Sequence, residues 1–475
     1  MIGIIAKREL TETIRDGRFR AAAAVVLLLL LAALALGIAQ AREAGRERAA
    51  ARAAERAAWL DQGARNPHSA AHFGQYAFKP TQALGWVDRG IDGYLGVAIW
   101  MEAHSQNPFR FRPAEDRLDL GRFGELTAAL VLRLLVPLLI FLLAFAAFAG
   151  ERELGQLHFA LASGTKGWVL AAGKAAGLGA ALGLVLLPGA LIGAFALLLA
   201  AGGEADRLPR ALLLALGYLL YFATLLALAL AVSALAANAR IALLVLLGFW
   251  IAGTLLGPRL ATDLAERWVE TPSASELKER IQQDLRAGLS GHDSEDVRFE
   301  ALKKRVLAQY KVARIEDLPV NFDGIALQAG EEYGNRVFDR HYGALWDGFL
   351  RQDRVRAVAA LASPALAIAD WSMSMCGTDL THYRHFAQAA EAHRRRIVRQ
   401  LNGDMTRNAG AAGFDYLAAE KLWRKVPELD HRPFPVADAV RAAWPRLALL
   451  MGWMLGAAGF AFWASTRLLG REVRS

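Results

Sequence analysis

The hydrophobic residues of this chain are gathered into six long blocks instead of alternating with polar positions. An α-helix rises 1.5 Å per residue, so about 20 apolar residues match the roughly 30 Å hydrocarbon thickness of a bilayer. A soluble chain of 475 residues would instead build several cores from interleaved apolar and polar positions. The pattern therefore predicts six transmembrane helices, over residues 21–40, 126–149, 169–200, 211–236, 241–256 and 446–466.

The segments between these spans are also predicted to be helical. Residues 1–20 have the pattern of an amphipathic interfacial helix, and the Ala/Arg/Glu-rich residues 41–60 continue the first span as a stalk. The fifth span is expected to stop at Gly257-Pro258. Further helices are expected at a capping box over 273–276 and over 296–310, 327–361 and 381–401.

Little strand alternation is visible anywhere in the chain. The predicted fold class is therefore an all-α membrane protein with six transmembrane helices. Residues 41–125 and 257–445, the loops after spans one and five, would form a mostly helical periplasmic domain.

Basic residues predict the orientation, because short loops rich in Lys and Arg stay in the cytoplasm. They occur in the N-terminal arm, after spans two and four, and in the C-terminal tail over 467–475. Both termini are thus expected in the cytoplasm, and the high Ala, Arg and Leu usage fits a GC-rich genome. Ala39-Gln40-Ala41 could be a cleavage site, but the apolar stretch of about 18 residues before it favours a retained span.

The net charge of +9 and the pI near 9.8 could indicate nucleic-acid binding. Many arginines flank the apolar blocks, however, where they anchor helices, so no nucleic-acid partner is expected. Cys376 is the only cysteine, which excludes an intrachain disulfide. The chain has no His-Glu-x-x-His, serine elbow or paired intramembrane carboxylates, so we do not expect an enzyme.

Residues 150–168, after the second span, are the most informative segment. They begin GERELGQL, are predicted to form one short amphipathic helix with Leu154, Leu157 and Leu161 on one face, and turn at Gly164. A short helix held between two spans would let a soluble partner move both. A charged loop with an interfacial helix has the same periodicity, so the pattern alone leaves both interpretations open.

This segment, the re-entry Gly173-Lys-x-x-Gly177 and the arm AKRELTETIRDGRFR (6–20) resemble the coupling region and N-terminal helix of type-2 ATP-binding-cassette (ABC) export permeases. The resemblance implies a transmembrane subunit that exports an unidentified substrate while two copies of a separate ATPase subunit hydrolyse ATP. It also implies a second permease chain, in a homodimer or with a paralogue, and a location in the inner membrane of a Gram-negative bacterium. The residues that it implies at the ATPase are Glu151, Arg152, Glu153, Gly155, Leu157 and Lys166.

The chain lacks a Gly-x-x-x-x-Gly-Lys-Ser/Thr phosphate loop. The nearest stretch, 167–174, has five residues between its glycines and is followed by Ala175, where a magnesium-binding hydroxyl should stand. We therefore expect no cofactor on this chain, with ATP and Mg held by the partner ATPase.

Three motifs in the outer segments, over 66–80, 94–109 and 377–395, resemble a subfamily with enlarged outer loops and no settled substrate. That subfamily is related to permeases of gliding-motility and nitrous-oxide-reductase maturation systems. The outer loops leave open an alternative, a mechanical transducer that drives a periplasmic protein machine without transmembrane cargo. A periplasmic partner is therefore possible, beside the lipid that surrounds the spans.

Two histidine pairs invite a metal interpretation. His68 and His72 have i, i+4 spacing and His382 and His385 have i, i+3 spacing, and the nearby segment 371–376 holds two thioethers and a thiol that would suit Cu(I). A proline and a glycine bracket the first pair and leave little room for a regular helix. Packing where the two outer segments meet is the favoured interpretation, and no metal site is predicted.

Overall fold

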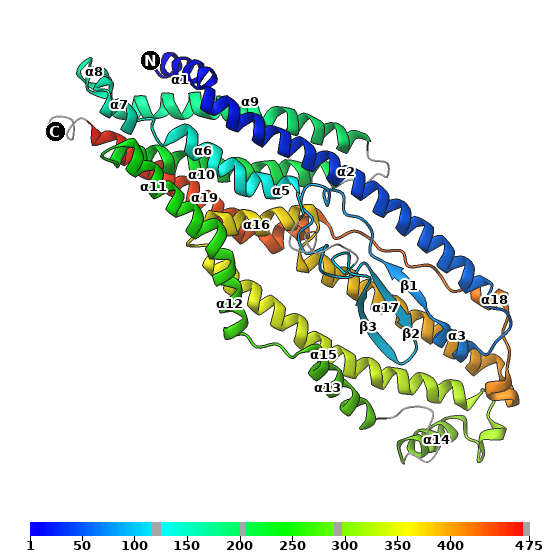
Figure 1. Ribbon diagram of the computed structural model, residues 1–475. Coiled ribbons are helices and arrows are strands. Elements are labelled where there is room, and N and C mark those ends of the chain that lie inside the picture. Colours follow the sequence, from blue (N-terminus) through cyan, green and yellow to red (C-terminus); the bar gives the residue numbers. More distant parts are fainter. Residues whose placement is uncertain (116–124, 200–205, 289–296, 469–475) are drawn as a thin grey trace.

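The computed structural model describes residues 1–115, 125–199, 206–288 and 297–468. Within these ranges six helices are long and apolar enough to cross a membrane, which confirms the predicted fold class. They cover Gly17–Leu60, Ala128–Glu153, Gly167–Leu199, Arg207–Leu235, Ala239–Trp268 and Val436–Thr466. The N-terminal helix and the far end of the sixth span lie at one end of the bundle, which we call the terminal end (Figure 1).

Four spans are single helices and two are composite. The single helices are α2 (Gly17–Leu60), α9 (Gly167–Leu199), α10 (Arg207–Leu235) and α19 (Val436–Thr466). The second span consists of α5 (Ala128–Leu130), the π-helix η1 (Val131–Leu135), α6 (Val136–Ala144) and α7 (Ala149–Glu153). The fifth consists of α11 (Ala239–Trp250), the π-helix η2 (Ile251–Leu256) and α12 (Gly257–Trp268). The short helix α8 (Gln156–Ala162) precedes α9.

The fifth span does not stop at Gly257-Pro258, contrary to the expectation from the sequence. Pro258 stands in the first turn of α12, directly after the π-helical turn. A proline is tolerated there because its missing N–H is not needed in the first turn of a helical segment. The helix therefore continues to Trp268, beyond the predicted end of the span.

The first span continues as a stalk, as the composition of residues 41–60 predicted. With 44 residues α2 is roughly 66 Å long, about twice the hydrocarbon thickness. Its far end is fixed by two tryptophans: the indole N–H of Trp59 donates to the carbonyl of Trp423 (3.1 Å), and that of Trp423 donates to Gly63 (2.9 Å). The stalk thus joins the C-terminal part of the chain far from the bundle.

The described residues between 61 and 127 and between 269 and 435 form an extramembrane domain at the other end of the bundle (Figure 1). Its first part contains α3 (Pro67–Phe73), β1 (Gln75–Phe78), β2 (Ala98–Glu102) and β3 (Ser105–Arg110). Its second part contains α13 (Ala274–Arg286), α14 (Val297–Tyr310), η3 (Ile315–Asp317), α15 (Phe322–Ala359), α16 (Pro364–Cys376), α17 (Leu380–Asn408), η4 (Gly410–Asp415) and α18 (Glu420–Trp423). The capping box at Ser273 and Glu276 is present at the start of α13, as predicted.

A three-stranded antiparallel sheet in the first part was missed by the sequence analysis. Strand β2 lies in the middle, with Tyr76 opposite Trp100 and Ile99 opposite Phe109. The strands have only four to six residues, and β3 (SQNPFR) is polar and contains a proline. Such short segments give no clear alternation of apolar and polar residues.

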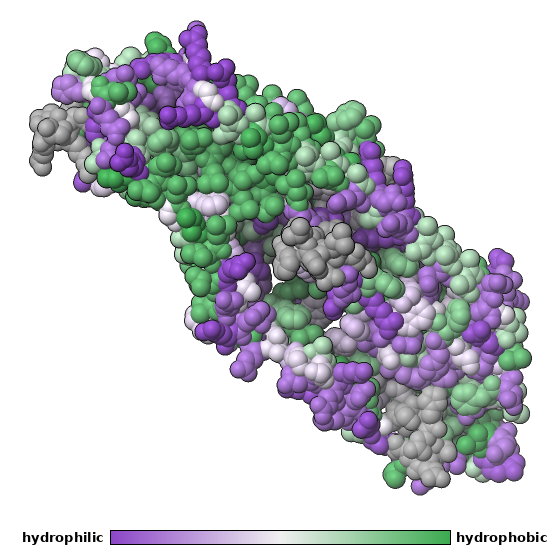
Figure 2. Space-filling model, in the orientation of Figure 1, coloured by the Kyte–Doolittle hydropathy of each residue, from purple (hydrophilic) through white to green (hydrophobic). Residues whose placement is uncertain are grey.

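The main hydrophobic core runs through the bundle and into the extramembrane domain, because residues of α16 belong to it together with residues of the spans. A second core lies farther out and joins the sheet to α17 and to the end of the stalk. On the face shown in Figure 2, an apolar band covers the bundle, and hydrophilic residues border it at the terminal end and at the extramembrane domain.

Candidate coupling site

Two short helices, α7 at the end of the second span and α8 before the third, stand where a single amphipathic helix was expected; we call residues 149–166 the coupling loop. Gly155 separates them with a φ of +69°, a left-handed conformation that glycine adopts without steric cost. Leu157 and Leu161 are buried against the bundle, as their spacing predicted. Leu154 is 72 % exposed and lies outside that face, because the chain turns at Gly155.

Two of the residues predicted to contact an ATPase tie the loop to neighbouring spans. Arg152 donates from its guanidinium to the carbonyls of Ala236 (2.6 Å) and Ala234 (2.9 Å), which end α10. Glu153 accepts a hydrogen bond from the amide of Ala239 (3.1 Å) at the start of α11. A cation at a helix C-terminus and a carboxylate at an N-terminus both complement the helix dipoles. Helix α7 is therefore attached to α10 and α11.

Ser233 of α10 strengthens the same junction. Its hydroxyl donates to the carbonyl of Phe145 (2.8 Å) and accepts from the amides of Phe148 (3.0 Å) and Ala149 (3.1 Å). These backbone groups lie where α6 ends and α7 begins. The fully buried hydroxyl thus provides hydrogen-bond partners for backbone groups at the break in the second span.

Glu151 takes part in an ion-pair cluster with two residues that the sequence analysis missed. The ammonium of Lys174 in α9 lies 2.9 Å from a carboxylate oxygen of Glu151 and 3.0 Å from one of Glu9. Lys174 is 3 % exposed, so it needs charged partners. Burial raises the pKa of Glu9, against the lowering effect of Lys174. A sequence signal was present, because Lys174 is the only charged residue within the apolar block 169–200.

The N-terminal helix α1 (Ile2–Arg15) packs along the beginning of α9 at the terminal end (Figure 1). Gly173 and Gly177 allow the close approach: a Cβ on Gly173 would stand 2.6 Å from Cβ of Ile5, and one on Gly177 would stand 2.6 Å from the carbonyl oxygen of Ala6. Lys174 stands between these two glycines on α9. Its ion pairs with Glu9 of α1 and Glu151 of α7 therefore hold α1, α7 and α9 together.

The remaining surface of the loop is exposed. Leu154 and Phe159 have 72 % and 75 % of their surface accessible, and Lys166 is exposed at the start of α9. Of the predicted contact residues, Glu153 and Lys166 are exposed, Glu151, Arg152 and Gly155 are half-buried, and Leu157 is buried. The apolar tip that Leu154 and Phe159 form was not singled out from the sequence, because Leu154 was assigned to the packed face.

At the opposite end of the bundle, α16 packs against spans α10 and α19. Its Trp371 is fully buried and donates from its indole N–H to the carbonyl of Leu213 in α10 (2.9 Å). Gly217, one turn farther along α10, makes room for the indole, since a Cβ there would stand 2.3 Å from Cδ1 of Trp371. The segment 371–376 is thus a packed core segment where the outer segments meet the bundle.

Arg210 fastens the same end of α10. Its guanidinium donates to the carbonyls of Ser374 (3.2 Å), Met375 (3.3 Å) and Phe434 (2.5 Å), and it lies 3.3 Å from Nε2 of His382. It therefore joins α10 to α16 and to the segment that leads into α19.

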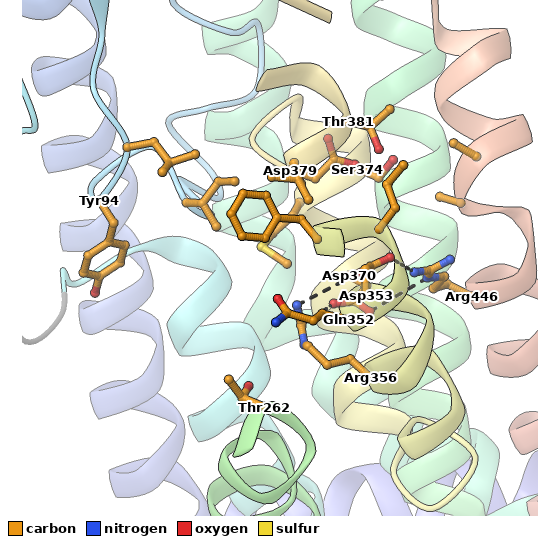
Figure 3. A pocket seen from close by; sticks show the side chains of 18 residues that line it. Tyr94, Thr262, Gln352, Asp353, Arg356, Asp370, Ser374, Asp379, Thr381 and Arg446 are labelled. Atoms are coloured by element: carbon orange, nitrogen blue, oxygen red, sulfur yellow. Dashed lines mark hydrogen bonds and ion pairs between the residues drawn. The ribbon is translucent and has the colours of Figure 1, made fainter. Parts of the chain in front are cut away.

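A cavity of about 390 Å³ lies beside α16, between α12, α15 and α19 (Figure 3). Four charged residues gather on one side of it (Figure 3). Arg446 forms an ion pair with Asp353, and Asp370 lies 2.8 Å from Arg356 and 3.8 Å from Arg446. The cavity is the meeting point of the spans and the extramembrane domain.

The two histidine pairs differ in the structure. His382 hydrogen-bonds to Asp379 (2.5 Å), whereas the ring of His385 lies against that of His431, with centroids 5.1 Å apart. That pair therefore does not converge. His68 and His72 do converge, because residues 67–73 form the short helix α3 that the flanking proline and glycine had seemed to prevent.

Six apolar spans, with an outer domain packed into one end of their bundle, define a polytopic membrane protein. The ABC-2 family transporter protein family matches residues 4–286, more than half of the chain, and a domain of unknown function (DUF3526) matches residues 276–432. The chain belongs to the ABC-2 transporter family, as the sequence resemblance indicated, and is a transmembrane subunit of an ABC transporter. No curated protein shows significant similarity to it.

Members of this family are generally non-catalytic transmembrane subunits that dimerise and work with an ATPase subunit. The subfamily suggested by the outer motifs is not distinguished by these matches. The second match coincides with most of the second part of the extramembrane domain, from α13 to the residues after α18.

Proposed function

We propose that this chain is the permease subunit of a type-2 ABC exporter and that a separate ATPase subunit docks on the tip formed by Leu154 and Phe159. The observation that carries the proposal is the contrast within one loop. Its apolar tip is exposed, while its base is tied to α1, α9, α10 and α11 through Glu151, Arg152 and Glu153. A subunit that grips the tip would therefore displace four helices together.

The proposed assembly has two permease chains, as a homodimer or with a paralogue, and two ATPase subunits that bind ATP and Mg. The terminal end of the bundle faces the cytoplasm of a bacterium, and the extramembrane domain faces the periplasm. The basic residues of the N-terminal arm and of the short loops support this orientation. The assembly would export a substrate that remains to be identified.

Co-purification tests the docking surface. The chain is co-expressed with candidate ATPase subunits and purified in nanodiscs, as wild type and as the double variant Leu154→Ala/Phe159→Ala. Full burial of a Leu or Phe side chain contributes about 1.5–3 kcal/mol, so losing both should weaken ATPase binding by at least about 100-fold. Leu417→Ala, at a residue of the extramembrane domain that is 62 % exposed, is the matched control and should retain the ATPase.

The base of the loop has a different expected behaviour. Arg152→Ala removes the two bonds to the end of α10 but leaves the tip in place. The ATPase should still co-purify, while ATP turnover should lose its response to the permease. If the tip variant retains its ATPase, or if no ATPase binds the wild type at all, the docking proposal is wrong.

A further inference from the structure

Three histidine rings converge in the extramembrane domain, far from the coupling loop. The Nε2 atom of His68 lies 3.2 Å from Nε2 of His72 and 3.4 Å from Nε2 of His104. One nitrogen from each ring lies within 4.8 Å of the other two. Among the described residues this is the one group of three such side chains close enough to share a metal ion.

The two nitrogen–nitrogen distances from His68 fit tetrahedral coordination. Zinc binds imidazole nitrogen at about 2.0–2.1 Å, and two ligands of a tetrahedral ion then stand about 3.3–3.4 Å apart. The two distances to His68 match this value. A hydrogen bond satisfies only two nitrogens with one proton, whereas an ion accepts the lone pairs of all three rings at once.

The backbone presents the rings from two separate elements. His68 and His72 lie one turn apart on α3, which begins with Pro67 after the cap Asn66 and ends at Gly74. His104 stands in the turn between β2 and β3 with a φ of +59°, in the left-handed region. A residue other than glycine is uncommon in that region, although histidine is among those found there more often. Residues in such sparsely populated backbone conformations cluster at functional sites, where the side chain has a role.

A carboxylate from the second part of the domain orients His104. Glu331 of α15 lies with one oxygen 2.8 Å from Nδ1 of His104 and accepts a hydrogen bond from the His104 amide (2.6 Å). Its other oxygen lies 3.2 Å from the guanidinium of Arg394, and both residues are at most 3 % exposed. A histidine that donates from Nδ1 to a carboxylate keeps the lone pair of Nε2 for a metal, which is the usual arrangement at zinc sites.

We propose that His68, His72 and His104 form a binding site for a divalent transition-metal ion, with Zn²⁺ as the ion whose geometry and ligand preference fit best. Glu331 is a positioning residue for His104. His72 is exposed, which leaves the fourth coordination position open on its side. Through Glu331 and Arg394, the bound ion would fasten α3 and the β2–β3 turn to α15 and α17, the two long helices of the second part.

Zinc titration of the full chain tests the ligands. The protein is purified in nanodiscs with a tag that contains no histidine, stripped with a chelator and titrated with Zn²⁺ against a chromophoric competitor. One high-affinity ion per chain is expected. The variant His72→Ala changes an exposed position, so the protein should still fold. It should weaken zinc binding by more than about 100-fold, because loss of a residue that only orients a ligand typically weakens binding by about 10- to 100-fold. Co²⁺ should give the visible bands of tetrahedral coordination.

The double variant His385→Ala/His431→Ala is the matched control, because its two rings also lie 5.1 Å apart in the same domain. It should keep full zinc affinity. The proposal is overturned if the wild type binds no stoichiometric zinc, if His72→Ala binds as well as wild type, or if the control loses binding equally.

The positioning role has its own readout. Glu331→Gln keeps an oxygen that can accept from His104 but removes the charge, so zinc affinity should fall about 10- to 100-fold while the tetrahedral Co²⁺ spectrum is retained. If Glu331 only supports the fold, the variant would lower thermal stability and leave the affinity of the folded protein unchanged. Neither experiment requires an ATPase, so its outcome is independent of the proposed transport function.

Discussion

Replacing Lys174 by methionine should detach the N-terminal helix. The substitution keeps the length of the side chain but leaves the carboxylates of Glu9 and Glu151 together without a cation. These side chains are only 14 % and 19 % exposed, so water replaces the lost partner poorly. Removing one partner of a buried ion pair costs about 3–5 kcal/mol. Helix α1 has no buried residue of its own, so much of that loss should fall on its docking.

Hydrogen exchange of the α1 amides in nanodiscs measures the effect. A loss of 3–5 kcal/mol corresponds to exchange faster by about 10²- to 10⁴-fold, provided that the docked helix opens locally. The sign of the pH dependence follows from the carboxylates. Without Lys174, Glu9 loses the cation that lowers its pKa, so this pKa, which burial already raises, rises further. The variant should therefore be least protected near pH 8 and should recover as the pH falls and the carboxylates become protonated.

The triple variant Lys174→Met/Glu9→Gln/Glu151→Gln is the control, because it removes the uncompensated charges together with the cation. It should regain most of the protection of α1. If the triple variant is as unprotected as the single one, then the uncompensated carboxylates are not the cause of the lost protection. If α1 exchanges equally in Lys174→Met and wild type, then the ion pairs do not hold α1. Packing at Gly173 and Gly177 would then have to account for its docking.

Two further substitutions test the outer end of the bundle. Gly217→Ala places a methyl group against Trp371 and should destabilise the fold by about 1–3 kcal/mol through overpacking, which lowers the apparent melting temperature. The control Gly183→Ala should not lower the melting temperature, because a Cβ at that position would have no atom within 4 Å. Arg446→Met leaves Asp370 with one fewer partner and should cost about 1–3 kcal/mol, seen as a lower melting temperature; unchanged melting would show that Arg446 does not stabilise this contact.

The spans could be predicted because the hydrocarbon thickness of a membrane requires a run of about 20 apolar residues in each spanning helix. The capping box at Ser273 is equally local, since its two residues lie three positions apart. The exact end of the fifth span could not be obtained in this way. Proline ends many helices, so the sequence predicted an end at Pro258. The structure shows that a π-helical turn precedes Pro258 and that the helix continues after it.

The residues of the candidate coupling site were found only in part, for a physical reason. The resemblance identified the loop, but which of its side chains turn inward depends on the break at Gly155 and on helices more than 80 residues away. The Lys174 cluster joins residues 9, 151 and 174, and no local pattern specifies such a contact. The same holds for His104, which lies beside His68 because β1, directly after α3, pairs with β2, directly before His104.

Helix α10 connects the two ends of the molecule. At the terminal end its last carbonyls accept from Arg152, and at the outer end its first turns hold Trp371 of α16 and are fastened through Arg210. It has 29 residues, about 43 Å, without a π-helical turn, and its one proline, Pro209, stands in the first turn. A continuous helix with both ends fastened transmits displacement better than the second and fifth spans, which contain π-helical turns. Movement at α7 should therefore reach α16 and the adjacent cavity mainly through α10.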